Sequence, residues 1–90
     1  MTQESMEDLV KRVVEEIREK DRSLDIALPF SIVVYDPQRS RMEGLLKTCN
    51  SLKSAVRSLY TLLKKEPTST GEIFFYQRQR KTVYRKITNE

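Results

Sequence analysis

The side chains best suited to chemistry in this 90-residue sequence are the aromatic and basic residues near its C-terminus. Residues 71–88, GEIFFYQRQRKTVYRKIT, interleave Phe74, Tyr76 and Tyr84 with five Lys or Arg residues. Aromatic rings can stack on nucleic-acid bases while Lys and Arg side chains bind phosphates. The combination indicates a surface suited to a polyanion, and the rest of the sequence must supply the elements that position it.

Residues that could support catalysis or hold a metal are scarce. The sequence has no histidine and one cysteine, Cys49, so a zinc site of the usual ligand composition is not expected. Cys49 belongs to the periodic row of apolar residues within positions 37–66, where a cysteine is typically a small core residue and not a nucleophile. The carboxylates of Glu15, Glu16 and Glu19 are typical of a solvated helix face. We therefore expect no enzymatic activity, no metal and no cofactor.

Charge is divided unevenly along the chain, whose formal net charge is +4. Residues 1–36 carry five basic and nine acidic side chains, whereas residues 37–90 carry twelve basic and four acidic ones. Clustered Lys and Arg residues gain free energy by displacing counterions from phosphates, so this asymmetry predicts a polyanionic partner for the C-terminal part. The alternative is a basic surface that only confers solubility.

The length suits a single domain, 1–90, with a small core. One cysteine cannot form an intramolecular disulfide, which suits a reducing compartment. No segment resembles a signal peptide, and no apolar run approaches the roughly 20 residues that a membrane span needs. We expect an intracellular protein without a membrane partner, located in the cytoplasm or, if it binds DNA, in the nucleoid or nucleus.

The N-terminal third contains clear local signals. Apolar residues with a 3.6-residue period predict an amphipathic helix over residues 5–22, with Ser5 as its N-cap. The β-branched and aromatic run FSIVVY predicts a buried strand at residues 30–35. Asp36 and Pro37 then favour a helix start, because Asp can cap a helix and Pro is tolerated at its first position.

Residues 37–66 have a helical pattern, with apolar residues that step by three and four. One interpretation is a single unbroken helix, which gives the order α-β-α-β-β and a heptad seam that could join chains as an oligomerisation module. The other interpretation is a break within residues 48–51, where four weak helix formers occur and Ser51 can cap a second helix at residues 52–65. Both interpretations belong to the α+β class.

The broken arrangement, α-β-α-α-β-β with a C-terminal antiparallel hairpin, resembles the winged helix-turn-helix DNA-binding domains. The residues that carry this likeness are LLKTCNSLKSAVRSLYTLLKKE followed by QRQRKTVYRKIT. The resemblance covers residues 30–88 and implies a first motif helix at residues 37–49, then a recognition helix at residues 52–65 in the major groove. It also implies a basic hairpin wing and a transcription regulator that binds DNA, often as a homodimer.

The expected nucleic-acid contacts lie on the outer face of the helix at residues 52–65 and on the hairpin. Val56, Leu59 and Leu63 would point inward, which leaves an outer face that is basic, rich in hydroxyls and free of carboxylates. Arg can read guanine edges, and Ser or Thr can contact bases or phosphate. The predicted set is Lys53, Ser54, Arg57, Ser58, Thr61, Lys64, Arg78, Arg80, Lys81 and Lys86.

Strands at residues 72–78 and 82–88 are expected to form the hairpin, and period-two alternation sorts their side chains into two faces. The expected core face holds Ile73, Phe75, Val83 and Ile87. The opposite face then holds Phe74, Tyr76, Arg78, Tyr84 and Lys86. If that second face is open, the chain would bind RNA or single strands. If the first helix covers it, Phe74 and Tyr76 would form a second buried layer instead.

Overall fold

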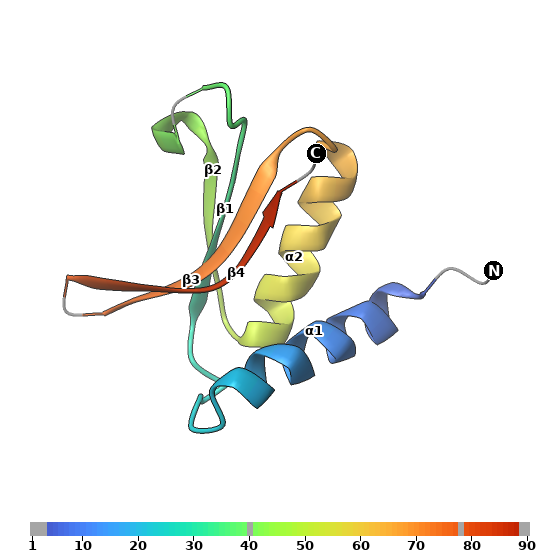
Figure 1. The fold of residues 1–90 in the computed structure, drawn as a ribbon, viewed down its shortest axis with the longest axis vertical. Coiled ribbons are helices and arrows are strands. Elements are labelled where there is room, and N and C mark those ends of the chain that lie inside the picture. The colour runs from blue at the N-terminus through green and yellow to red at the C-terminus, as the bar shows by residue number, and fades with distance from the viewer. Residues whose placement is uncertain (1–3, 40, 78, 89–90) are drawn as a thin grey trace.

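The computed structural model describes residues 4–39, 41–77 and 79–88. It forms an α+β fold in which one helix packs on a four-stranded antiparallel sheet of order β2-β1-β3-β4 and the N-terminal helix packs against that helix (Figure 1). The elements are α1 (Met6–Lys20), β1 (Phe30–Tyr35), the 3₁₀ helix η1 (Arg41–Glu43), β2 (Leu45–Cys49), α2 (Leu52–Lys65), β3 (Thr70–Gln77) and β4 (Arg80–Thr88). Among these residues, no helix has the length and apolar character that crossing a bilayer requires.

Local capping signals begin both α-helices where the sequence predicts them. The Oγ of Ser5 accepts a hydrogen bond from the backbone N–H of Asp8 at 3.2 Å, and the Oγ of Ser51 accepts one from Ser54 at 3.2 Å. Such caps satisfy amide groups that have no partner inside the first turn of a helix. The two predicted helices that these residues begin are confirmed.

The described residues of 37–49 form a turn, the short η1 and β2, so both the predicted α-helix there and the unbroken helix at 37–66 are wrong. Asp36 begins a turn instead, because its Oδ1 accepts the backbone N–H of Gln38 at 2.9 Å. The chain continues through η1 into β2, which pairs antiparallel with β1. Apart from η1, the order of elements is therefore α-β-β-α-β-β.

The wrong helix has a simple physical cause, since a spacing of four residues suits a helix and a strand equally. Leu45 and Cys49 would share a helix face after about one turn, and they also share a strand face because side chains alternate. Pairing with β1 decides the outcome, with Leu45 opposite Val34 and Cys49 opposite Phe30. Met42, which belongs to the same apolar pattern, is 94% exposed.

The core lies between the helices and one face of the sheet. The largest fully buried side chains are Phe30, Ile32, Leu52, Leu59, Ile73, Val13 and Val56. Gly71 lets α2 approach β3 closely, because a Cβ at this position would lie 2.5 Å from the Cδ1 of Leu59. The apolar side of α2 is thus occupied within this chain, and the 37–66 seam that the sequence offered for oligomerisation does not exist.

Candidate nucleic-acid interface

The sheet has one face that α2 covers and one face that neither α1 nor α2 covers. Along β1, Ile32 points toward the helices and is fully buried, whereas Val33 points the other way. Antiparallel pairing places Leu46 and Glu72 opposite Val33. We call this second surface the open face. Its principal side chains are Tyr35, Glu72, Phe74, Tyr76, Lys81 and Lys86.

Two aromatic rings of β3 lie on the open face. Tyr76 is 61% exposed, and Phe74 is half-buried. Phe74 pairs with Val83 and Tyr76 with Lys81 on the neighbouring strand. The sequence alone left two arrangements for these rings, a layer buried beneath a helix or an exposed platform. Because α2 packs on the other face and Tyr76 is exposed, its ring is accessible for stacking.

A nearly buried carboxylate lies on the same face. The Glu72 side chain is 5% exposed, and its Oε2 accepts the hydroxyl of Tyr35 at 3.0 Å. The Nζ of Lys81 donates to Oε1 of Glu72 at 3.2 Å and also lies 4.7 Å from the ring centroid of Phe74. A charge removed from water needs such partners, because its desolvation is costly.

The sequence-based site missed Tyr35 and Glu72. One signal was present, because Glu72 is the single acidic residue between positions 71 and 88. The environment of Glu72 could not be predicted without the pairing of β1 with β3. This pairing places Val33 opposite Glu72 and lets the Tyr35 hydroxyl donate to the Glu72 carboxylate. Only this long-range pairing joins these residues.

A β-bulge decides which β4 side chains meet the core. The register shifts between Ile73, which pairs with Arg85, and Phe74, which pairs with Val83. Tyr84 is therefore the extra residue on β4, and the alternation of side chains changes at this point. Simple period-two reasoning fails beyond such an insertion.

The bulge overturns two predicted positions. Val83, expected in the core, is 46% exposed on the open face. Tyr84, expected on the opposite face, packs against Phe30 with ring centroids 5.6 Å apart. Burial, and secondarily the nearby carboxylate of Asp21, raises the pKa of Tyr84. The remaining predicted contacts with the core are confirmed for Ile73, Phe75 and Ile87.

An ion pair ties the bulged strand to α1. The Nη1 of Arg85 donates to Oε2 of Glu16 at 2.9 Å, and Arg12 donates to the other oxygen at 3.2 Å. Desolvation raises the pKa of Glu16, but the hydrogen bonds from the two guanidinium groups outweigh it and hold that pKa below its ordinary value of 4.5. Arg85 therefore binds α1 and is not available to the open face.

The predicted contact residues divide between two surfaces. The polar side of α2 points away from the sheet, since its apolar side packs on the sheet. It carries the exposed residues Lys53, Ser54, Arg57, Thr61 and Lys64, with Ser58 half-buried. Lys81 and Lys86 lie on the open face, whereas Arg80 lines a pocket with Asp21 and Asp25 at the α1 end. Arg78 lies outside the described residues.

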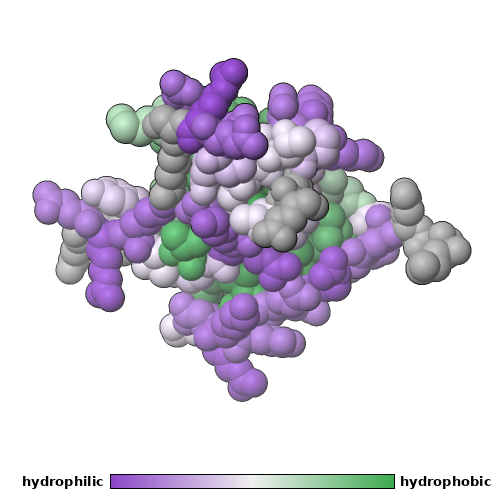
Figure 2. Space-filling view, turned by 45° about the horizontal axis from the view of Figure 1, so that its top comes forward, coloured by the Kyte–Doolittle hydropathy of each residue, from purple (hydrophilic) through white to green (hydrophobic). Residues whose placement is uncertain are grey.

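The surface has a polar character with local apolar areas. Figure 2 shows hydrophilic side chains projecting over most of the visible face, with smaller hydrophobic areas between them. Met42, Leu45 and Leu46, at or just before β2, are 94%, 54% and 63% exposed. Strand order places β2 and the basic strand β4 at opposite edges of the sheet. The exposed leucines of β2 therefore lie at the opposite edge of the sheet from the basic strand β4.

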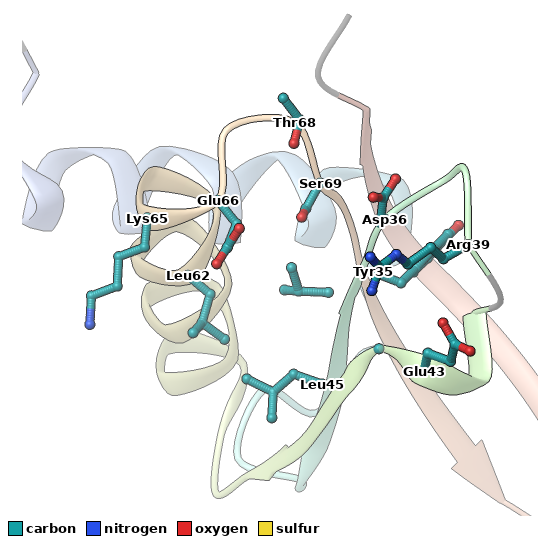
Figure 3. Close-up of a pocket in the computed structure, with 12 residues that line it drawn as sticks. Tyr35, Asp36, Arg39, Glu43, Leu45, Leu62, Lys65, Glu66, Thr68 and Ser69 are labelled. Atoms are coloured by element: carbon teal, nitrogen blue, oxygen red, sulfur yellow. The ribbon is translucent and has the colours of Figure 1, made fainter.

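A separate pocket of about 430 Å³ lies between α2 and the segment that joins β1 to β2 (Figure 3). Leu45 and Leu62 line its apolar part, and Lys65 points away from it. Charges of both signs surround the opening, with Arg39 near carboxylates of the same rim. Such a mixture favours no single ligand chemistry, so the open face is the stronger candidate site.

Comparison with protein-family models, with curated proteins and with solved structures gave no significant match. Within the described ranges, no group of three or more His, Cys, Asp or Glu residues is arranged to hold a metal ion. The functional interpretation therefore depends on the geometry of the open face.

Proposed function

We propose that this chain binds single-stranded nucleic acid, RNA or single-stranded DNA, through the open face and catalyses no reaction. The observation that carries the proposal is the 61% exposure of Tyr76 on a sheet face that also holds Phe74 and two lysines. The rings offer flat apolar surfaces, and Lys81 and Lys86 offer positive charge beside them.

A single strand presents unpaired bases, which the aromatic rings of this face can stack on, and phosphates, which its lysines can bind. Unpaired bases expose their ring faces, and stacking on an aromatic side chain contributes about 1–3 kcal/mol per base. Lysines on the same face can neutralise phosphates and release counterions. Bases in a duplex are already stacked on one another, so a flat aromatic surface favours single strands.

Duplex DNA binding through α2 is the second candidate. It is supported by the exposed side chains of Lys53, Arg57 and Lys64 on a helix face without a carboxylate. It ranks second because residues 37–49 form η1 and β2, so α2 lacks the preceding helix of a helix-turn-helix. The polar face of α2 and the open face also point in opposite directions, so one segment of DNA would not contact both.

Fluorescence anisotropy with labelled single-stranded RNA, single-stranded DNA and a duplex of the same sequence distinguishes these candidates. We expect both single strands to bind more tightly than the duplex. Tyr76→Ala should raise the dissociation constant about tenfold, since it removes one stacking surface. Tyr76→Phe is the matched control and should bind like the wild type, because it keeps the ring.

Two results would count against the proposal. If Tyr76→Ala and the wild type bind single strands with equal affinity, Tyr76 does not contact the nucleic acid. Tighter binding of the duplex, weakened by Arg57→Gln and not by Tyr76→Ala, would support α2 instead.

A further inference from the structure

Lys81 occupies a position that a stacked base would need. Its Nζ lies 4.7 Å from the centroid of the Phe74 ring, on the open face. A base stacks at a separation close to van der Waals contact, so the ammonium group and a base cannot occupy the same side of this ring together. In the unbound chain, the ring of Phe74 is thus covered by a cation of the same protein.

Glu72 is the anion that holds Lys81 there. The Nζ to Oε1 distance is 3.2 Å, and the side chains of Lys81 and Glu72 are 28% and 5% exposed. Partial burial strengthens the attraction, because fewer water molecules screen it. Cation–π attraction to Phe74 favours the same position of the ammonium group.

A phosphate offers Lys81 an equivalent anion outside the sheet. When Lys81 moves from Glu72 to a phosphate, one charge-assisted hydrogen bond replaces another. The Glu72 carboxylate keeps the hydroxyl of Tyr35, which donates to its other oxygen at 3.0 Å. The exchange therefore leaves Glu72 hydrogen-bonded and uncovers Phe74.

We propose that Lys81 is a switch in the binding of single strands: Glu72 holds it over Phe74 in the free protein, and a phosphate draws it away so that a base can stack. This inference rests on the proposed function and adds its regulation. Binding then has two coupled parts, the capture of a phosphate by Lys81 and the opening of a second stacking surface beside Tyr76. Glu72 sets the affinity by competing with phosphate for one lysine.

A double-mutant cycle tests the switch with a labelled single-stranded oligonucleotide. The four proteins are the wild type, Glu72→Gln, Lys81→Met and the double variant. Glu72→Gln keeps the shape and the hydrogen-bonding capacity of the side chain but loses the charge that holds Lys81. We expect it to bind the oligonucleotide five- to tenfold more tightly than the wild type does. In the Lys81→Met background, the same substitution should change affinity less than twofold.

Two further variants separate the switch from a general charge effect and from misfolding. Glu66→Gln removes an exposed carboxylate away from the open face and should change affinity less than twofold. Tyr35→Phe changes no charge, and it should weaken binding about twofold because Glu72 then depends more on Lys81. Thermal unfolding confirms that each variant is folded.

The outcomes distinguish the switch from the function on which it rests. If single strands bind and Tyr76→Ala weakens them, but Glu72→Gln acts equally with and without Lys81, the switch is overturned and the proposed function stands. If no variant and no wild-type protein binds single strands even at low salt, both are overturned. Tightening by Glu72→Gln only when Lys81 is present supports both.

Discussion

The two faces of the sheet use the same strands for different purposes. On the covered face, side chains are apolar and closely fitted, as the approach of Leu59 to Gly71 shows. On the open face, Tyr76 is exposed, whereas Val33 and Glu72 are buried, and Tyr35 and Lys81 donate hydrogen bonds to the Glu72 carboxylate. Alternation along β3 thus separates side chains that pack against α2 from side chains on the open face, of which Tyr76 is exposed. Substitutions on the two faces should have separable effects.

The largest contrast is expected between two leucines. Leu59→Ala should lower the free energy of unfolding by about 2–5 kcal/mol, because Leu59 is fully buried. Leu46→Ala is the matched control on the open face, where the side chain is 63% exposed, and should change stability by less than about 0.5 kcal/mol. Urea denaturation followed by circular dichroism measures both. Similar losses would mean that the open face is packed as well.

The contact between β3 and α2 is tested by adding one methyl group. Gly71→Ala should destabilise the chain by about 1–3 kcal/mol, because its Cβ would meet the buried side chain of Leu59. Gly44→Ala gains the same group where the backbone φ is not positive, so it should be tolerated. Denaturation curves of the two variants report the difference. A harmless Gly71→Ala would show that α2 can move away from the sheet.

The salt dependence of binding distinguishes phosphate contacts on the open face from phosphate contacts on the outer face of α2. Lys86→Gln removes a cation of the open face and should reduce the slope of log affinity against log salt by about 0.7 for a single strand. Arg57→Gln removes an exposed cation of α2 and should leave that slope unchanged. Anisotropy titrations at several potassium chloride concentrations give the slopes. The reverse pattern would assign the phosphate contacts to α2.

The smallest expected effect is the loss at low pH of the stability that the ion pairs of Glu16 contribute. Because the pKa of folded Glu16 lies below its ordinary value of 4.5, this group stabilises the fold above that value. The contribution is lost as pH falls through the folded pKa. The stability difference between wild type and Glu16→Gln should therefore shrink on acidification. Glu15→Gln, on the same helix, is the control, and chemical denaturation at several pH values provides the comparison.

Part of the fold could be predicted from short stretches of sequence. The helix that begins at Ser5, the strand at residues 30–35 and the helix that begins at Ser51 were all correctly predicted. Each depends on neighbouring residues, through a cap or a periodic apolar pattern. The basic character of the hairpin also follows from its sequence, and Lys86 lies on the open face, as predicted for the face opposite the core.

The remaining features depend on residues distant in sequence. β2 was mistaken for a helix because the spacing of Leu45 and Cys49 fits both, and only pairing with β1 selects the strand. The bulge at Tyr84 likewise comes from the register of β3 and β4, and the sequence contains no separate sign of it.

Two capped helices, a buried central strand and a basic aromatic hairpin follow from local sequence signals, because caps and periodicity act over a few residues. The strand conformation of β2, the packing of Tyr84 against Phe30 and the exposure of Tyr76 depend on tertiary contacts. Tertiary structure also brought Tyr35 and Lys81 to Glu72, from strands 37 and 9 residues away in the chain. Strand pairing and register are long-range choices, and they are made by the burial of the whole sheet against the helices.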